Sequence, residues 1–259
     1  MTSDVITAAA DKLWAAQRDR VPIAPLTQLY RGVDVGTAYG VQQANLQRRL
    51  QLGATLIGHK IGLTSASMQQ LLGVNEPDYG FIVDDMVIST PTVDIKWFCA
   101  PRVEPEVAFL LHKALRGPGV SAADVRKSTE AVAVALEIVD SRIADWKLTL
   151  ADTVADNASS GAIVLGEWAP YTEALALPQA TATLTLNGNV IESGTGDAVM
   201  GDPAAAVAWL ANALAEFGTE LSPGQLVMSG SFTSAAFVHA GDIATATISG
   251  LGTVSLRFT

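Results

Sequence analysis

The chain has 259 residues, of which 49% are hydrophobic and 16% are charged, and this composition excludes a disordered or low-complexity protein. Its formal net charge of -10 argues against general binding to a nucleic-acid backbone or to an anionic membrane. The single cysteine, Cys99, excludes an intrachain disulfide and a multi-cysteine metal site.

The N-terminal segment carries Asp4, Asp11 and Lys12 where a signal peptide would be apolar. The longest apolar stretches are expected to fall short of the ~20 residues that span a bilayer. We therefore expect a soluble, cytoplasmic protein. The length suits one domain, residues 1–259, with a small helical region over about residues 1–55.

The first part of the chain is predicted to be helical. Residues 4–17 are rich in alanine, and their apolar side chains recur near helical spacing. Residues 37–52 form a second predicted helix, in which Leu46 and Leu50 share one face and Gly53 follows as a stop.

Short runs rich in β-branched residues follow, and their pattern is typical of strands bounded by turns. The predicted strands cover residues 102–111, 131–139, 182–186, 189–193, 225–230, 243–249 and 253–258. Asn187-Gly188 predicts a tight hairpin between two of them, because a type I′ turn needs positive φ at both central positions.

One late helix is well delimited by its end signals. Asp202 is suited to cap it, Pro203 suits its first position, and Gly218 is suited to end it. Helices at the start, followed by many strands and an isolated helix, predict an α+β fold rather than repeated βαβ units.

Residues 102–111, RVEPEVAFLL, carry the most informative pattern. Alternate residues of a strand share a face, so Glu104 and Glu106 point one way and Val103 and Val107 the other. Two carboxylates are costly to bury on an apolar strand, and a divalent cation such as Mg²⁺ or Mn²⁺ would resolve that conflict. The alternative is an edge strand with two solvated glutamates, which the spacing alone favours.

A third acid, Glu137, lies near the end of the apolar run 131–139. Glu137 either emerges into water at the strand end or faces a ligand, since an unpaired buried glutamate is rare. Together with Glu104 and Glu106 it could supply three carboxylates to one cation, with positions left open for water or substrate.

Residues 58–80 hold a second candidate set. Lys60 lies between glycines in a strand-like stretch, where a buried lysine could act in acid–base chemistry or bind an anionic substrate; a surface lysine is the commoner case. Asp78 lies in a turn-like NEPDYG, where aspartate usually makes a local hydrogen bond. The neighbouring His59, alone, indicates a structural or exposed residue.

Residues 152–161, DTVADNASSG, are small and polar. Asn157 and Ser160 could present hydrogen-bond donors to a carboxylate, and the alternative is an ordinary Asx or Ser turn. The sequence contains neither GxSxG nor GxGxxG, and MSGS at residues 228–231 is not a phosphate loop.

Five segments together resemble the 2-keto-4-pentenoate hydratase group of the fumarylacetoacetate hydrolase superfamily. They keep the family order and lie within a match over most of residues 37–245. The segments are KIGLTS (60–65), QQLLGVNEPDYG (69–80), RVEPEVAF (102–109), EIVDSRIADWK (137–147) and ADNASSG (155–161).

The resemblance implies an α+β fold in which N-terminal helices precede a large mixed sheet rolled around the active site. It implies a site for Mg²⁺ or Mn²⁺ formed by Glu104, Glu106 and Glu137.

The other site residues that the resemblance implies come from the second and fifth candidate segments. Lys60 and Asp78 would be catalytic, in an order of proton transfers that the sequence leaves open, and Asn157 and Ser160 would contact the substrate.

The activity implied is the addition of water to 2-hydroxypenta-2,4-dienoate, or to a 5-alkyl homologue, in meta-cleavage catabolism of aromatic or steroid compounds. The product would be 4-hydroxy-2-oxopentanoate. Family members form homo-oligomers, and an association with a sister or downstream pathway enzyme is a further expectation. The alternatives are the sister 4-oxalocrotonate decarboxylase, a C–C hydrolase of acylpyruvates, and a non-catalytic partner subunit.

Overall fold

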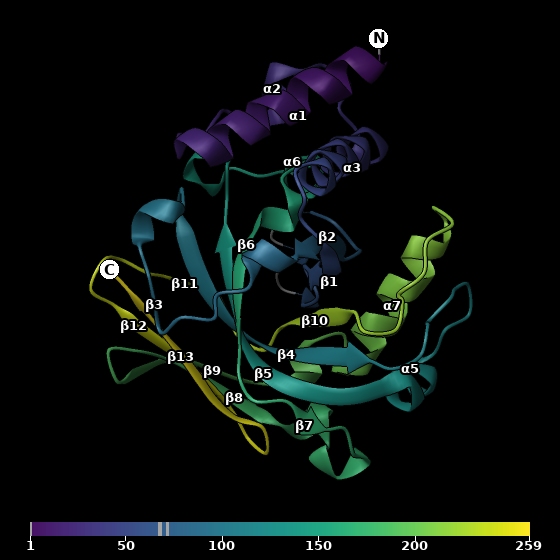
Figure 1. Ribbon diagram of the computed structural model, residues 1–259, viewed down its shortest axis with the longest axis vertical. Helices are drawn as coiled ribbons and strands as arrows, with labels where there is room; N and C mark the ends of the chain where they lie inside the picture. The colour runs from purple at the N-terminus through teal and green to yellow at the C-terminus, as the bar shows by residue number, and fades with distance from the viewer. Residues whose placement is uncertain (1, 67–68, 71–72) are drawn as a thin grey trace.

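The computed structural model describes residues 2–66, 69–70 and 73–259. Helices gather at the N-terminal end of the molecule (Figure 1). They are α1 (Thr2–Asp19), α2 (Leu26–Leu29), α3 (Val35–Gln51) and, from later in the chain, α6 (Leu150–Ala155). The two helices predicted for the first part of the chain are confirmed. Helix α3 starts slightly earlier than predicted because the Asp34 carboxylate caps it, accepting a hydrogen bond from the Thr37 N–H.

A large sheet curls beneath these helices (Figure 1). Its strand order is β2-β1-β10-β4-β5-β6, with β11 beside β4 and β7 beside β5. Strands β1 and β10 are parallel while the other neighbours are antiparallel, so the sheet is mixed. The bounds are β1 Leu56–Gly62, β2 Asp78–Val83, β4 Pro101–Leu111, β5 Thr129–Asp140, β6 Ser160–Leu165, β7 Ala169–Pro170, β10 Leu226–Ser231 and β11 Ala236–Phe237.

A second sheet has the order β3-β13-β12-β8-β9. Its strands are β3 (Thr92–Val93), β8 (Thr181–Leu186), β9 (Asn189–Thr195), β12 (Ile243–Ile248) and β13 (Gly252–Phe258). The predicted hairpin is confirmed, because Asn187 and Gly188 join β8 to β9 with φ of 53° and 82°.

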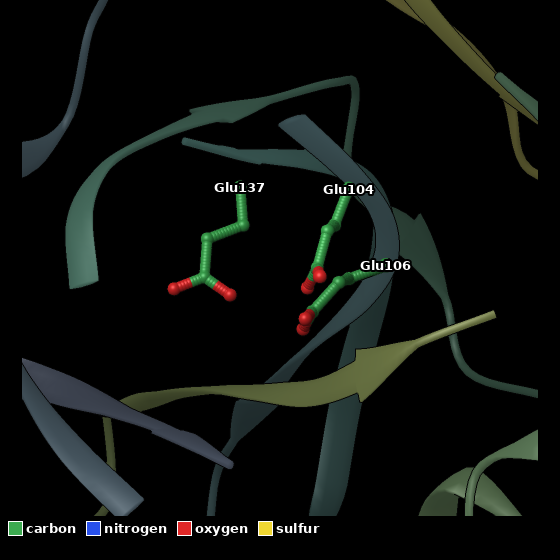
Figure 2. A group of neighbouring side chains, drawn as sticks. All are labelled: Glu104, Glu106 and Glu137. Atoms are coloured by element: carbon green, nitrogen blue, oxygen red, sulfur yellow. The ribbon is translucent and has the colours of Figure 1, made fainter. Parts of the chain in front are cut away.

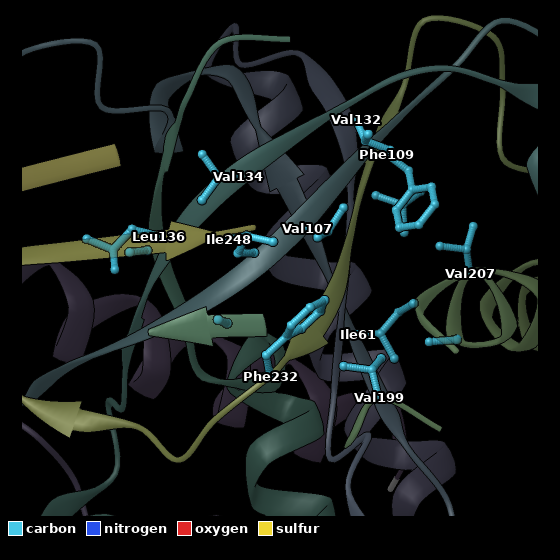
Figure 3. Close-up of a cluster of buried hydrophobic side chains, with 14 of the residues drawn as sticks. Ile61, Val107, Phe109, Val132, Val134, Leu136, Val199, Val207, Phe232 and Ile248 are labelled. Atoms are coloured by element: carbon cyan, nitrogen blue, oxygen red, sulfur yellow. The ribbon is translucent and has the colours of Figure 1, made fainter. Parts of the chain in front are cut away.

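The main hydrophobic core lies between the two sheets (Figure 3). Val107 of β4 and Leu136 of β5 pack there with Ile248 of β12. Val103 and Val107, predicted to face away from the neighbouring glutamates, are fully buried in this core. This face of the large sheet is therefore committed to packing. The opposite face carries Glu104, Glu106 and Glu137 beside a smaller apolar cluster that includes Ala108 and Ala135.

Helix α7 (Pro203–Ala215) packs on the same core, as the sequence predicts, and contacts the short helix α5 (Ala122–Ser128). The Asp202 carboxylate caps α7 by accepting a hydrogen bond from the Ala204 N–H. Contrary to the sequence prediction, Gly196–Ala215 is long and apolar enough to cross a membrane, with a mean hydropathy of 1.2. Half of this stretch is buried and only its second part is α7, so it serves here as a core helix.

The α+β fold predicted from the sequence is confirmed, with differences in two segments. Asp78 begins strand β2 rather than lying in a turn. Residues 150–165 form helix α6, a tight turn at Asn157–Ser159 and strand β6, and neither this helix nor this strand was predicted. Short 3₁₀ helices complete the chain: η1 Asp84–Met86, η2 Ile95–Trp97, η3 Ala144–Trp146, η4 Asn157–Ser159, η5 Glu173–Leu175, η6 Leu177–Gln179 and η7 Gly196–Ala198.

Candidate active site

The large sheet brings the three predicted metal ligands together. Glu104 on β4 pairs directly with Glu137 on β5, and Glu106 follows on the same face of β4. One carboxylate oxygen from each glutamate lies within 4.8 Å of the others, and the three side chains converge on one space (Figure 2). Because β4 lies between β10 and β5, the alternative of a solvated edge strand is excluded.

These carboxylates are not satisfied by the protein alone. Glu106 and Glu137 are fully buried and Glu104 is partly exposed. Glu106 Oε2 accepts a hydrogen bond from the Gly230 N–H at 2.9 Å, whereas neither oxygen of Glu137 has a donor within the described part of the chain. Buried carboxylates without partners are costly, and an all-oxygen ligand set suits a hard divalent cation. The residues present therefore fit such an ion.

Electrostatic repulsion supports the same conclusion. Burial, together with the Glu137 carboxylate, raises the pKa of Glu104 to about 7. Burial, together with Glu137 and Glu104, also raises the pKa of Glu106 well above its usual value. A bound cation would favour the ionised forms and remove this conflict.

Lys60 and Asp78 face the three glutamates from strands β1 and β2. Lys60 pairs with Gly80 and Asp78 pairs with Gly62, so all four residues share one face of this ladder. Both charged side chains are buried, and Lys60 Nζ lies 3.4 Å from Glu137 Oε1. The structure thus joins Lys60 to the glutamate set, although this contact is an ion pair without hydrogen-bond alignment.

Glycine at position 62 makes this arrangement possible. A Cβ atom there would overlap Asp78 Oδ1 and come within 3.3 Å of Lys60 Nζ. Thr153 Oγ1, on α6, donates a hydrogen bond to Asp78 Oδ2 at 3.1 Å, while Asp78 Oδ1 has no partner among the described residues. One oxygen of Asp78 is therefore fixed and the other is available to a ligand.

The ionisation of this pair depends on opposing effects. Burial acts to lower the pKa of Lys60, whereas the nearby carboxylates of Glu137, Asp78 and Glu106 act to raise it. The carboxylates together outweigh burial, so the net shift of this pKa is upward. Burial also raises the pKa of Asp78, and Lys60 opposes that shift. Lys60 is consequently a buried ammonium group that offsets part of the negative charge.

A strained turn holds Asn157 against β2, the strand that begins with Asp78, and leads into Ser160 at the start of β6. Asn157, Ala158 and Ser159 have φ of 58°, 50° and 51°, a run of left-handed conformations that costs non-glycine residues about 1–2 kcal/mol each. The Asn157 amide accepts from the Phe81 N–H at 2.8 Å and donates to the Phe81 carbonyl at 3.0 Å. This amide, predicted to contact substrate, therefore holds β2 in place here.

Ser160 differs from Asn157 in its hydrogen bonding. It is buried, and its Oγ has no partner in the part of the chain that the structure describes. Of the two predicted substrate contacts, Ser160 is thus the one whose side chain is free to make one.

The sequence reasoning missed a buried ion pair that supports the turn. Arg142 Nε lies 2.5 Å from Asp156 Oδ1, and the Arg142 guanidinium also donates to the carbonyl oxygens of Asp140 and Ser160. The signal was present in the segments DSR and ADN, but fourteen residues separate the partners. Thr149 and Asp152, which form a capping box at the start of α6, were a clearer signal for the missed helix.

The sequence model for the fumarylacetoacetate (FAA) hydrolase C-terminal domain matches residues 61–259, which contain every candidate residue named above except Lys60. The chain belongs to the fumarylacetoacetate hydrolase family. This confirms the resemblance found in the five motifs.

Full-length relatives narrow the position of the chain within the fumarylacetoacetate hydrolase family. It is 42% identical over 257 residues to a 2-hydroxyhexa-2,4-dienoate hydratase of Comamonas testosteroni, covering 98% of this chain and 97% of that protein. It is 39% identical over 259 residues to a 2-keto-4-pentenoate hydratase of Paraburkholderia xenovorans strain LB400, covering 100% and 96%.

A solved structure agrees with the fold and with a divalent-metal site. The 4-oxalocrotonate decarboxylase of Pseudomonas putida G7, complexed with magnesium and adipate, superposes with a TM-score of 0.96 at 34% sequence identity. The match covers 100% of this chain and 98% of that one.

Proposed function

We propose that this protein is a hydro-lyase that adds water to 2-hydroxypenta-2,4-dienoate, or to a 5-alkyl homologue, and releases 4-hydroxy-2-oxopentanoate or its homologue. The observation that carries the proposal is the cluster of three glutamates, two of them fully buried, that faces Lys60 and Asp78. Its support in sequence is the identity of 39–42% with full-length hydratases. Such an enzyme acts in meta-cleavage catabolism of aromatic or steroid compounds.

Glu104, Glu106 and Glu137 would hold Mg²⁺ or Mn²⁺ in this enzyme. The ion, when bound, supplies Lewis-acid polarisation of the substrate's C2 oxygen. The three carboxylates leave a net negative charge on such a site, and the Lys60 ammonium offsets it. Burial keeps bulk water away, which strengthens each electrostatic interaction with charge that develops during the reaction.

Lys60 and Asp78 would carry out the proton transfers. The reaction moves one proton to C5 of the dienol, which leaves a C3=C4 double bond conjugated to the C2 carbonyl. Water then adds at C4, loses a proton, and C3 is protonated. Lys60 Nζ and the unpartnered Asp78 Oδ1 are the two groups positioned to hold these protons and to orient the water. Ser160 Oγ would contact the substrate carboxylate.

A direct assay tests this function. Purified protein with Mg²⁺ is supplied with 2-hydroxypenta-2,4-dienoate, the loss of dienol absorbance is followed, and the product is identified by mass spectrometry. We expect one molecule of water to be added per turnover and activity to disappear after treatment with a chelator. A fully folded, metal-loaded protein that leaves the dienol unchanged would refute the proposal.

A decarboxylase is the second candidate, favoured by the close superposition on 4-oxalocrotonate decarboxylase. Release of CO₂ from 4-oxalocrotonate, in the same buffer and with the same metal, would support it. We expect little release, because the curated hydratases share more identity with this chain, 39–42% against 34%.

We further propose that the protein works in the cytoplasm as a homo-oligomer of single-domain chains. The shared core between the two sheets supports one domain. Light scattering of the purified protein after size exclusion tests the oligomeric state, and limited proteolysis tests the single domain. A monomer, or a stable fragment lacking one sheet, would contradict them.

A further inference from the structure

Arg102 continues the row of charged side chains on β4. It lies two residues before Glu104, so it shares the face of β4 that carries Glu104 and Glu106. Its neighbours across the sheet are Phe237 on β11 and Val139 on β5. Arg102 therefore borders the acidic site without being part of the proposed metal-ligand set.

Two aromatic rings hold the Arg102 guanidinium group. Its central carbon lies 4.2 Å from the centroid of the Trp146 ring and 4.1 Å from that of Phe237. Trp146 is itself fixed, since its Nε1–H donates to the Ala100 carbonyl at 3.2 Å. The rings restrict rotation of the guanidinium but do not use its N–H groups, which point outward in the plane of the group. The guanidinium is therefore preorganised to bind a planar acceptor.

The donors of Arg102 are not used up by the protein. Its Nε atom is buried and has no hydrogen-bond partner within residues 2–66, 69–70 and 73–259. No carboxylate in that part of the chain lies within ion-pair distance of Arg102, although Glu104 and Arg102 influence each other electrostatically. Phe237 is 53% exposed, which places the clamp at the solvent side of the site. A buried, unpartnered donor at this place indicates an external acceptor.

The charge of the site explains why such a donor is useful. Four carboxylates outweigh Lys60 and a divalent ion, so the site remains negative and opposes an anionic substrate. An arginine fork matches a carboxylate in shape and charge, and at the mouth of the site it would offset this repulsion.

We propose that Arg102, clamped by Trp146 and Phe237, is a specificity residue that binds a carboxylate group of the substrate at the mouth of the acidic site. The inference rests on the proposed function in one respect, that the substrate is a carboxylic acid. Two carboxylates share this chemistry: the one beside the 2-oxo group, and a distal one at the end of a longer tail.

Binding measurements test the role without turnover. Wild type and Arg102→Met are titrated with Mn²⁺ and then, with Mn²⁺ saturating, with 2-oxopentanoate and 2-oxoadipate. We expect Arg102→Met to weaken binding of a 2-oxo acid about tenfold or more, the usual size for a lost charged hydrogen bond. Mn²⁺ affinity should stay equal or become tighter, because a neighbouring positive charge has been removed.

Weaker binding of the 2-oxo acid without weaker binding of Mn²⁺ separates carboxylate recognition from a merely structural role. The matched control is Arg116→Met, which removes an exposed arginine paired with Glu220 and should change neither affinity. If Arg102→Met folds poorly, Phe237→Leu replaces it, because this exposed ring can be lost without opening the core. We expect Phe237→Leu to weaken 2-oxo acid binding by about threefold, the smaller loss expected for one cation–π contact.

Comparing the two acids identifies which carboxylate Arg102 binds. Weaker binding of both acids assigns Arg102 to the carboxylate beside the 2-oxo group, and weaker binding of 2-oxoadipate alone assigns it to the distal one. Unchanged binding of both, no binding of either acid by wild type, or parallel loss of acid and Mn²⁺ binding would each overturn the inference. Because no step requires turnover, a failed hydration assay would leave this result readable by itself.

Discussion

Two groups of buried charge flank the end of β5, and they are built in opposite ways. The ion pair of Arg142 with Asp156 has its hydrogen bonds made within the protein, since the guanidinium also donates to three backbone carbonyls. The carboxylate of Glu137, earlier in the same strand, faces Glu104 and Glu106 and has no hydrogen-bond donor among the described residues. The charges of the first group have all their partners within the protein, whereas those of the second group lack partners unless a ligand binds.

This difference separates buried charges that the fold satisfies by itself from buried charges that need an external partner. Burial alone does not mark a binding site, because a buried charge whose hydrogen bonds are all made within the protein can serve the fold. A buried charge with unused hydrogen-bonding capacity is stable only when something else supplies a partner. Substitutions in the two groups should therefore affect different measured quantities.

Lys60→Ala should produce the largest effect on activity. It removes the ammonium that faces Glu137 and Asp78, so we expect turnover to fall by at least about a hundredfold, within the range for loss of an acid–base group. The protein should remain folded by circular dichroism. Lys113→Ala, which changes an exposed lysine, is the control, and wild-type rates in Lys60→Ala would refute a catalytic role.

Asp156→Asn should produce the largest effect on stability. It leaves the buried Arg142 without its counter-charge, so the free energy of unfolding should fall by about 3–5 kcal/mol. Urea denaturation with and without Mg²⁺ measures this loss, which should be the same in both conditions. A loss that appears only with Mg²⁺ would assign the ion pair to the metal site and so remove the contrast between the two groups.

Glu137→Gln should behave in the opposite way. It keeps the shape of the side chain but removes one of three repelling charges, so the metal-free protein should be no less stable than wild type. Affinity for Mg²⁺ should fall by more than about tenfold, since even changes outside the ligand set have effects of that size. Calorimetric titration and thermal melting measure the two quantities. Equal Mg²⁺ affinity in both proteins would mean that Glu137 is not a ligand.

A smaller effect is expected in how the free energy of unfolding of the metal-free protein depends on pH. The pKa of Glu104 is about 7 in the folded protein against an ordinary value of 4.5, so the folded state holds this proton more tightly. Its stabilising contribution is complete below about pH 4.5 and is lost as the pH rises through about 7. Denaturation at several pH values should show this decline in wild type and a weaker one in Glu104→Gln, and saturating Mg²⁺ should reduce it. The prediction is contradicted if, without metal, the free energy of unfolding rises between about pH 4.5 and 7 and rises equally in wild type and Glu104→Gln.

Local sequence patterns predicted the elements whose ends are set locally. Helix α7 has its own cap at Asp202, and the β8–β9 hairpin has its own turn at Asn187-Gly188. Strand β2 was not predicted, because it starts at Asp78 only through pairing with Gly62 of β1. That pairing joins residues far apart in the chain, and no local pattern encodes it.

The candidate site follows the same division. Strand alternation placed Glu104 and Glu106 on one face, but their meeting with Glu137 depends on the register between β4 and β5. The motif resemblance supplied Lys60 and Asp78, whereas the arrangement of hydrogen bonds around them required the structure. The sequence contains no signal that would distinguish the engaged amide of Asn157 from a free one.

Thr153→Val should give the smallest effect, at the point where the two charged groups are connected. Thr153 belongs to α6, the helix that leads into Asp156, and its hydroxyl donates to Asp78 Oδ2 in the proposed active site. Valine keeps the shape and removes this donor, so Asp78 loses its fixed orientation and one interaction that lowers its pKa. We expect kcat to fall about two- to tenfold, the equivalent of one ordinary hydrogen bond, with little change in the free energy of unfolding. Thr153→Ser keeps the hydroxyl and should retain most of the activity. Equal kcat values in the valine and serine variants would show that Asp78 is oriented without Thr153. Helix α6 would then not support the proposed active site through this contact.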